Sequence, residues 1–458
     1  MPDARYDLII IGGGPAGHVA AERAGALGKK VLVVEKSHLG GVCLNQGCIP
    51  TKTLLYSAKL FSQARHSETY GVLVEGARYD LAKAMAWKAK VVETIRKGIA
   101  YQFRTHGVEL VTGSARIASR AAGLVTVEVD GKPYAAPNLL IATGSTPVVL
   151  PIPGAERAMG STEALEIQKL PKSIVVIGGG YIGMEFASYF TQVGTKVSVV
   201  EMLPEIVPLL DPAIAKVLRG SLPDVDFHLG AKVLAIEPDG ADRAAHRVRF
   251  LQEGKEQSIQ AEAVLMSVGR RPIVESIGLE GAGVDFDRKG IRVDERMRTN
   301  VPGIWAAGDV NGRSMLAHSA SRMGEVAVAD MFGSPQRMRY DAIPWVVYTN
   351  PEVSGAGLSE EQARAAGRSV KTASLDHRAN GRFVAENEKG RGMCKIVVDA
   401  ASGALLGAQM IGPFSSEIIA GAAAMIEAEL RVKDIREIVF PHPTVSEALR
   451  DTVWALKE

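Results

Sequence analysis

A strand, a glycine-rich turn, a helix and a second strand that ends in an acidic residue occur twice in this chain. The first copy reads YDLIIIGGGPAGHVAAERAGALGKKVLVVEK from Tyr6, and the second reads KSIVVIGGGYIGMEFASYFTQVGTKVSVVEM from Lys172. The copies keep a constant offset of 166 residues, from Gly12 to Gly178 and from Glu35 to Glu201. A glycine turn that follows a strand and opens a helix indicates a βαβ unit of a parallel sheet. Two such units predict an α/β fold.

The glycines of both copies predict nucleotide binding. They let backbone N–H groups approach a pyrophosphate, which the helix N-terminus stabilises through its unpaired donors and dipole. The acid accepts a hydrogen bond from a ribose hydroxyl. A tight strand-to-helix turn without a ligand is the alternative. The predicted nucleotide-binding residues are Gly12, Gly14, Gly17 and Glu35 in the first copy and Gly178, Gly180, Gly183 and Glu201 in the second.

The residues after the second acid indicate which nucleotide binds there. Met202, Leu203 and Pro204 follow Glu201 and offer no positive charge. A 2′-phosphate would meet the Glu201 carboxylate rather than an arginine. The second site is therefore predicted to prefer NAD over NADP.

Two cysteines, Cys43 and Cys48, follow the first nucleotide-binding unit in the run GGVCLNQGCIPTK. On a regular α-helix, residues at this spacing have Cα atoms ~8–9 Å apart, whereas a disulfide needs Cα atoms within about 7 Å. If the two bond to each other, the backbone must depart from regular helix, which Gly47 and Pro50 tolerate or impose. The alternative is a pair of small buried core residues. Beside a nucleotide motif, the pair suggests a redox-active dithiol, with a flavin at the first site and a nicotinamide at the second.

The composition restricts partners and compartment. The chain has 458 residues, 47% hydrophobic and 23% charged, with a formal net charge of +2. This length allows about three domains, and the balanced charge does not favour nucleic acid or a membrane surface as partner. Three cysteines argue against a secreted disulfide framework, and Cys394 in the strand-like run MCKIVVD is predicted to be a core residue. We expect no signal peptide, membrane span or metal site, and a cytoplasmic location.

Turn-forming residues divide the chain into four predicted segments. Pro147, Pro151 and Pro153 follow the strand-like run NLLIATGS, and GRRP from Gly269 closes the second unit. After GIWAAGDV the chain is expected to return to the first domain. From about Asp341, strand-like VVYTNPEVSGAGL, MCKIVVD and ALLGAQMIG alternate with helical EEQARAAG and SSEIIAGAAAMIEAEL. We predict an FAD-binding domain over 1–148, an NAD-binding domain over 149–268, a second part of the FAD-binding or central domain over 269–338, and a C-terminal α+β interface domain over 339–458.

Motifs along essentially the whole chain resemble those of the pyridine nucleotide-disulfide oxidoreductase family, most closely its dihydrolipoamide dehydrogenase branch. They are GGVCLNQGCIPTK, LLIATGS, GGGYIGMEFAS, AAGDV, MLAH, VVYTNPEVSGAG and HPTVSEA. The resemblance implies two Rossmann-like domains, for FAD and NAD, and a C-terminal α+β dimerisation domain. It also implies a homodimer whose active site is shared across the interface.

The resemblance assigns roles around the flavin. Cys43 matches the outer sulfur that meets the substrate, and Cys48 matches the inner sulfur that stacks against FAD. Lys52 matches the lysine beside the reactive edge of the flavin, paired with Glu185. Tyr181 matches the aromatic residue that covers the nicotinamide pocket, with a tyrosine that only packs as the alternative. The other implied cofactor-binding residues are Asp309 at the ribityl chain, Gly113, Thr143, Gly144 and Ala317 at FAD, and Val233 and Gly269.

The resemblance also selects a base among the nine histidines. His442 matches a histidine that reaches into the partner's active site, and Glu447 matches the glutamate that holds its other nitrogen. A histidine with an ordinary pKa of about 6.5 can take a proton from a thiol of about 8.5. A capping box from Thr444 to Glu447 would also explain the glutamate, and both roles can share one side chain. The chain departs from the family pattern at Phe440-Pro441 and Gln46.

The predicted function is reoxidation of dihydrolipoyl groups borne by another protein of a 2-oxoacid dehydrogenase or glycine-cleavage complex, with NAD⁺ as acceptor. Another disulfide or metal-ion reductase of the family is one alternative. A glutathione reductase would favour NADP, and a mercuric reductase would end in paired cysteines, whereas this chain ends TVWALKE. A non-catalytic flavoprotein scaffold is the other alternative, although a scaffold needs none of Cys43, Cys48, Lys52 and His442.

Overall fold

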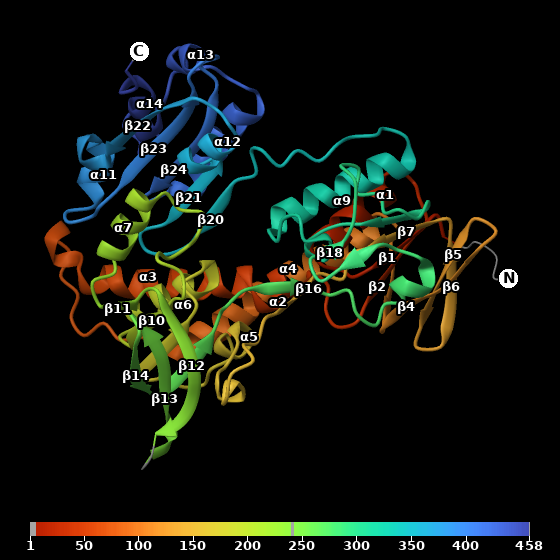
Figure 1. The fold of residues 1–458 in the computed structure, drawn as a ribbon, viewed down its shortest axis with the longest axis horizontal. Helices are drawn as coiled ribbons and strands as arrows, with labels where there is room; N and C mark the ends of the chain where they lie inside the picture. Colours follow the sequence, from red (N-terminus) through yellow and green to blue (C-terminus); the bar gives the residue numbers. More distant parts are fainter. Residues whose placement is uncertain (1–5, 240–241, 458) are drawn as a thin grey trace. The chain divides into compact units, whose positions relative to one another are not determined.

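The structure is a computed structural model that describes residues 6–239 and 242–457. The chain forms two compact units (Figure 1). Unit 1 comprises residues 1–53, 85–148 and 269–339, and unit 2 comprises residues 54–84, 149–268 and 340–458. The chain leaves unit 1 within helix α3 (Cys48–Arg65) and returns within helix α4 (Leu81–Thr105). The division into four segments stays a prediction.

A five-stranded parallel sheet forms the centre of unit 1. Its order is β19-β7-β1-β2-β3, with bounds Ile304–Ala306, Asn138–Ile141, Leu8–Ile11, Val31–Glu35 and Glu109–Thr112. β1 and β2 are buried along their whole length, as expected for nearly continuous aliphatic runs inside a parallel sheet. Ile11 pairs with Val34 on one side and Ile141 on the other, so these strands end at the same edge. β19, which lies within the run GIWAAGDV, pairs with β7 and so belongs to this sheet.

Helices α1 (Pro15–Ala26) and α9 (Ala317–Phe332) pack against each other in unit 1 (Figure 1). Their contact is close because small residues form it: a Cβ atom at Gly324 would lie 2.4 Å from the Ala16 carbonyl oxygen. The remaining elements of unit 1 are the antiparallel sheet β4-β5-β6 (Ala115–Ala121, Leu124–Val129, Lys132–Ala136), the strand pairs β8–β16 (Ser145–Pro147, Arg270–Pro272) and β17–β18 (Phe286–Asp287, Gly290–Ile291), and the helices α2 (Gly41–Gln46), α8 (Leu279–Ala282) and η3 (Asp309–Asn311).

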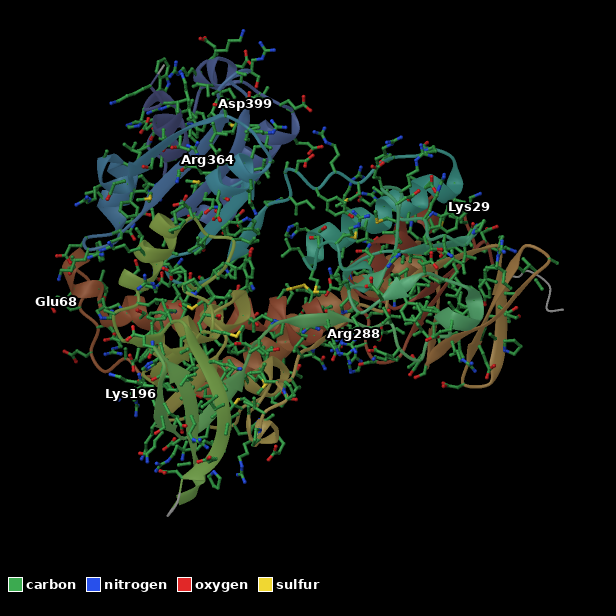
Figure 2. The ribbon with its side chains drawn as sticks, in the orientation of Figure 1. Lys29, Glu68, Lys196, Arg288, Arg364 and Asp399 are labelled. Atoms are coloured by element: carbon green, nitrogen blue, oxygen red, sulfur yellow. A yellow bond between two sulfur atoms is a disulfide. The ribbon has the colours of Figure 1, made fainter. Side chains whose placement is uncertain are left out.

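The second nucleotide-binding copy forms a four-stranded parallel sheet in unit 2. Its order is β11-β10-β9-β15, with bounds Val225–His228, Lys196–Val200, Ser173–Ile177 and Ala263–Met266. Lys196 is exposed at the start of β10, whereas the four following residues are buried (Figure 2). Helix α6 (Tyr181–Gln192) follows β9, as α1 follows β1. The antiparallel sheet β12-β13-β14 (Ala231–Asp239, Asp242–Gln252, Lys255–Ala261) shares a hydrophobic core with these strands.

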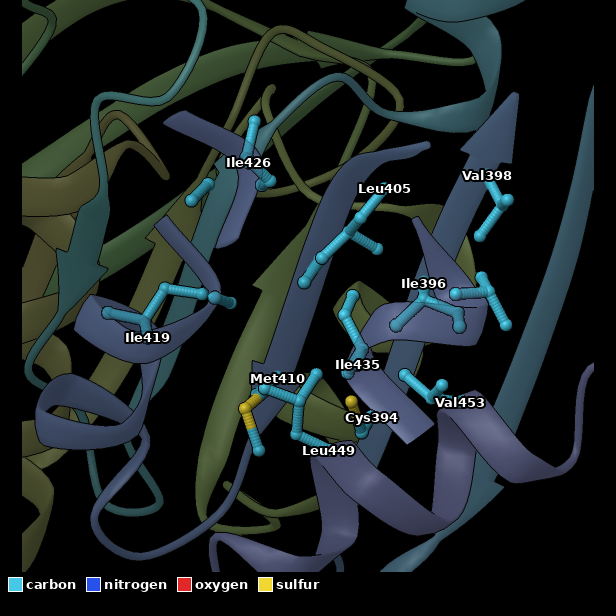
Figure 3. Close-up of a cluster of buried hydrophobic side chains, with 14 of the residues drawn as sticks. Cys394, Ile396, Val398, Leu405, Met410, Ile419, Ile426, Ile435, Leu449 and Val453 are labelled. Carbon is cyan, nitrogen blue, oxygen red and sulfur yellow. The ribbon is translucent and has the colours of Figure 1, made fainter. Parts of the chain in front are cut away.

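A five-stranded antiparallel sheet forms the C-terminal part of unit 2. Its order is β20-β21-β24-β23-β22, with bounds Trp345–Val347, Val353–Gly357, Leu405–Ile411, Met393–Asp399 and Val370–Asp376. Helices α12 (Ser415–Glu427) and α14 (Glu447–Trp454) contribute to its core (Figure 3). Cys394 is fully buried in that core, as predicted. The run VVYTNPEVSGAGL, expected as one strand, forms two, with a cis Asn350–Pro351 bond between them.

The α/β fold class, with its two Rossmann-like sheets and C-terminal α+β region, is confirmed. Within the described part of the chain, no helix is long and apolar enough to cross a membrane. The short elements of unit 2 not yet given are η1 (Ser67–Tyr70), η2 (Ala155–Arg157), α5 (Ser161–Ala164), α7 (Pro212–Gly220), α10 (Glu360–Ala365), η4 (His377–Ala379), α11 (Gly381–Glu386) and α13 (Val432–Arg436).

Candidate active site

The first glycine turn lies at the carboxyl edge of the sheet in unit 1, between β1 and α1. Gly12 has φ +105°, and a Cβ atom there would lie 2.2 Å from the Ala142 carbonyl oxygen. A Cβ atom at Gly17 would lie 1.8 Å from the Gly12 carbonyl oxygen. Gly14 differs, because a Cβ atom there would meet only Gly41 at 3.8 Å. Gly12 and Gly17 thus fold the turn, whereas Gly14 leaves open space in front of the helix N-terminus.

The second turn, between β9 and α6, repeats this geometry in unit 2. A Cβ atom at Gly178 would lie 2.6 Å from the Ser267 carbonyl oxygen, and one at Gly183 would lie 1.9 Å from the Gly178 carbonyl oxygen. A Cβ atom at Gly180 would meet nothing within 4 Å. Gly14 and Gly180 are the N-cap residues of their helices and, as glycines, supply no capping side chain. The first backbone N–H groups of each helix therefore face a space suited to a phosphate.

The two acids make the same hydrogen bonds in their own units. Glu35 accepts from the Gly13 N–H (2.8 Å) and the Ser37 N–H (2.8 Å). Glu201 accepts from the Gly179 N–H (2.5 Å) and the Leu203 N–H (2.7 Å). Each carboxylate therefore holds its glycine turn to the end of the second strand, a contact that sequence spacing did not reveal.

The carboxyl edge of the sheet in unit 1 also carries other predicted flavin-binding residues. Gly113 follows β3 and donates its N–H to the Glu35 carbonyl oxygen at 3.1 Å. Thr143 follows β7 and donates its hydroxyl to the Ile273 carbonyl oxygen at 2.9 Å. Gly144 has φ +77° and open space at its Cβ position. Ala317 is the first residue of α9, whose N-cap makes no side-chain hydrogen bond.

Asp309 belongs to a largely buried polar cluster at this edge, in which Ser145 is buried and Asp309 and Arg270 are half-buried. It accepts a hydrogen bond from the Ser145 hydroxyl at 2.5 Å, and the Arg270 guanidinium donates to that hydroxyl and to the Ser145 carbonyl oxygen, both at 2.7 Å. Burial raises the pKa of the Asp309 carboxyl, partly offset by the Ser145 hydrogen bond and the Arg270 charge. Ser145 and Arg270 lie in the recognised runs LLIATGS and GRRP, but only the fold brings them together.

Cys43 and Cys48 form a disulfide in unit 1, which excludes the alternative of two separate core thiols. Their Cα atoms are 4.6 Å apart because α2 ends at Gln46 and α3 begins at Cys48, with Gly47 outside both helices. This is the predicted departure from regular helix at Gly47, whereas Pro50 lies within the first turn of α3. Lys52 follows one turn later on α3 and is half-buried.

The nicotinamide-site candidates lie mainly on α6 in unit 2. Tyr181 is half-buried, and its ring makes an edge contact with Trp345 at 6.2 Å between centroids. Burial raises the pKa of the Tyr181 hydroxyl. Glu185 is buried and accepts from the Tyr348 N–H at 3.1 Å. No sequence signal singled out Trp345 or Tyr348 as neighbours of these residues.

The two remaining cofactor-binding candidates lie in different units. Val233 is buried in β12, where it pairs with Phe250 and belongs to the hydrophobic core. Gly269 lies in unit 1 with φ +111°, and its carbonyl oxygen accepts from the Val148 N–H at 3.0 Å. Their contact with a cofactor stays a prediction.

His442 and Glu447 form the predicted pair in unit 2. The His442 Nδ1 atom lies 3.1 Å from each Glu447 carboxylate oxygen, which leaves Nε2 for a substrate. The His442 side chain is 79% exposed, whereas that of Glu447 is 7% exposed. A hydrogen bond from the Thr444 N–H is the largest cause that lowers the pKa of Glu447, and His442 and Arg450 lower it further.

The predicted capping box from Thr444 to Glu447 is wrong in part. Helix α14 begins at Glu447, and its N-cap is Ser446 rather than Thr444. Glu447 does accept the Thr444 N–H at 3.0 Å, but the Thr444 hydroxyl donates to the Pro441 carbonyl oxygen instead of capping the helix. The Glu447 carboxylate therefore accepts a hydrogen bond from the loop backbone and also lies beside the His442 ring.

Comparison with protein families gives two matches. The family described as pyridine nucleotide-disulphide oxidoreductase matches residues 6–324. The dimerisation domain of the same family matches residues 343–453.

Comparisons with individual proteins agree with the family matches. The dihydrolipoyl dehydrogenase of Geobacillus stearothermophilus is 39% identical, covering 96% of this chain and 94% of its own length. The dihydrolipoyl dehydrogenase of Thermus scotoductus is 39% identical and covers 98% of this chain and 97% of its own. Among solved structures, the HOCl-induced flavoprotein disulfide reductase RclA from Escherichia coli is 30% identical with a TM-score of 0.85, covering 99% of this chain and 100% of its own.

Proposed function

Because the chain belongs to the pyridine nucleotide-disulphide oxidoreductase family, we propose that it catalyses the dihydrolipoyl dehydrogenase reaction. A dihydrolipoyl dithiol is oxidised to the cyclic disulfide, and NAD⁺ is reduced to NADH with release of one proton. The observation that carries this function is the Cys43–Cys48 disulfide, which follows the first strand-turn-helix-strand unit in a chain that has a second such unit ending in Glu201.

The enzyme uses FAD and NAD. When bound, FAD supplies two-electron redox chemistry between a dithiol and a nicotinamide. The open space at Gly14 and the uncapped N-terminus of α1 fit the pyrophosphate of FAD in unit 1. The half-buried Asp309 carboxylate fits an acceptor of ribityl hydroxyl groups. Gly180 and Glu201 fit NAD in unit 2 in the same way.

We assign the thiol chemistry to four side chains. His442 removes a proton from a substrate thiol, and the thiolate attacks Cys43, which breaks the Cys43–Cys48 bond and forms a mixed disulfide. The second substrate thiol then attacks the first substrate sulfur and closes the lipoyl ring. Its proton passes to Cys43, which leaves as a thiol, while Cys48 remains as the inner thiolate and His442 holds the first proton. Glu447 keeps the His442 ring oriented with Nε2 toward the substrate, since its carboxylate lies beside Nδ1.

The family match to a dimerisation domain supports a homodimer. We propose that His442 acts on the cysteines of the partner subunit, that the substrate is a lipoyl group borne by a separate protein of a multienzyme complex, and that the protein is cytoplasmic. The resemblance of the HPTVSEA motif to that of the family supports the shared site.

Two paired assays test the function. Purified FAD-loaded protein is expected to oxidise NADH with lipoamide at least about 100-fold faster than NADPH with glutathione disulfide. Cys43→Ser and Cys48→Ser should each abolish lipoamide turnover, while the matched control Cys394→Ala, which removes a buried sulfur elsewhere, retains it. Preference for glutathione and NADPH, or turnover unchanged by Cys48→Ser, would contradict the proposal.

A further inference from the structure

Asn45 lies between the two cysteines in the sequence, and its side-chain amide makes hydrogen bonds with both its nitrogen and its oxygen. Its Nδ2 amide donates to the Leu39 carbonyl oxygen at 3.0 Å and to the Gly41 carbonyl oxygen at 2.8 Å. Its Oδ1 atom accepts from Arg96 Nε at 3.2 Å and Nη2 at 2.7 Å. Four hydrogen bonds therefore converge on one side chain in α2, which is only six residues long.

Arg96 comes from the long helix α4, within the part that belongs to unit 1. Its third nitrogen, Nη1, binds the Glu93 carboxylate at 3.0 Å, one turn earlier on the same helix. The Arg96 side chain is 31% exposed, and its guanidinium is bound on one side by Asn45 and on the other by Glu93. A planar guanidinium with two N–H groups on one oxygen fixes direction as well as distance, which a lysine ammonium does not.

These hydrogen bonds matter most when the disulfide is open. Reduction breaks the Cys43–Cys48 bond with two electrons and two protons, and it removes the side-chain cross-link between α2 and α3. Gly47 then remains as the only residue between the two helices. The hydrogen bonds of Asn45 contain no sulfur, so breaking the disulfide does not remove them.

We propose that Arg96 is a positioning residue that acts through Asn45 to hold Cys43 near Cys48 in the reduced enzyme. This inference deepens the proposed function, on which its catalytic meaning rests. A held dithiol closes more readily than a loose one, because its sulfurs are already at a high effective concentration. Loss of the contact should therefore make the disulfide easier to reduce.

The test compares dithiol potentials of the holoenzyme and its variants. Each protein is equilibrated with mixtures of reduced and oxidised dithiothreitol, quenched with acid, and scored for free Cys43 and Cys48 by alkylation and mass spectrometry. For Arg96→Met, we expect about a tenfold shift of the equilibrium toward dithiol, equal to ~30 mV for a two-electron couple. Asn45→Ala should give a similar shift, and the double variant no more than the larger single effect.

The controls separate positioning from charge and from folding. Lys97→Met removes a neighbouring cation that binds Glu93 at 3.5 Å, and it should leave the potential unchanged. Arg96→Lys keeps the positive charge but loses the paired N–H groups that donate to Asn45, and it should shift the potential by an intermediate amount. If Arg96→Met fails to fold, this variant still tests the inference. A wild-type potential in folded Arg96→Lys and Asn45→Ala, or additive effects in the double variant, would overturn the inference. Dithiothreitol replaces lipoamide, so absence of lipoamide turnover would refute the proposed function without deciding this result.

Discussion

Glu447 contributes both to the fold of its loop and to the proposed thiol chemistry. Its carboxylate is nearly buried, yet it accepts the Thr444 N–H, faces His442 and lies 3.2 Å from Arg450. Each of these neighbours favours the ionised form and lowers the pKa of the carboxyl. The same charge therefore stabilises the loop before α14 and orients the proposed base.

Glu447→Gln tests the stabilising part of this role. A carboxylate whose pKa is lowered in the folded state contributes stability that is fully present above the ordinary carboxyl pKa of about 4.3 and is lost as the pH falls through the lower folded value. We expect Glu447→Gln to cost about 1–2 kcal/mol at neutral pH, and the difference in Tm from wild type to shrink below the carboxyl range. The exposed Glu437→Gln is the control, and a difference in Tm that is constant with pH would contradict the explanation.

At the scale of the element, the glycines of each strand-turn-helix unit have two different tasks. Some allow the close backbone approach that forms the turn, and one leaves open space at the helix N-terminus. Gly183 lies against the Gly178 carbonyl oxygen, whereas Gly180 faces open space with φ −74° and ψ −172°, a conformation that alanine also adopts. The two positions belong to one short motif, but the structure gives them different physical tasks.

Matched alanine substitutions separate these tasks. Gly183→Ala should lower the Tm markedly, because overpacking costs about 1–3 kcal/mol. Gly180→Ala should keep a Tm close to wild type and weaken NADH binding by about tenfold or more, because its methyl group occupies the space predicted for the pyrophosphate. Thermal unfolding and NADH titration by fluorescence measure both quantities. Unchanged NADH binding in folded Gly180→Ala would show that this turn does not hold the nucleotide.

At the scale of the whole molecule, the two halves of the thiol chemistry lie in different compact units. The disulfide belongs to unit 1, and the His442–Glu447 pair belongs to unit 2. A shared site in a two-fold dimer would combine the cysteines of one chain with the histidine of the other.

Mixed dimers test this sharing. Cys43→Ser and His442→Gln homodimers should each be nearly inactive. A heterodimer of the two has one site with both residues intact, so co-refolded equal mixtures should regain about a quarter of wild-type lipoamide activity. Tagged purification of the heterodimer should yield about half. If activity does not return, the histidine acts within its own chain or does not act on the thiol.

The sequence alone determined the α/β class, both nucleotide turns, the core position of Cys394 and the family, because these depend on local order. A glycine turn, a strand and a helix follow each other in the chain, and their spacing is read directly. The runs MCKIVVD and SSEIIAGAAAMIEAEL became β23 and α12 for the same reason.

Only the tertiary structure decided which distant side chains meet. The Arg270–Ser145–Asp309 cluster joins three separate segments at one sheet edge, and Arg96 reaches Asn45 from another helix. The N-cap of α14 is Ser446 rather than the expected Thr444. The Thr444 hydroxyl instead donates a hydrogen bond to the Pro441 carbonyl oxygen. Hydrogen bonds between segments depend on packing and burial in three dimensions, which no local pattern encodes.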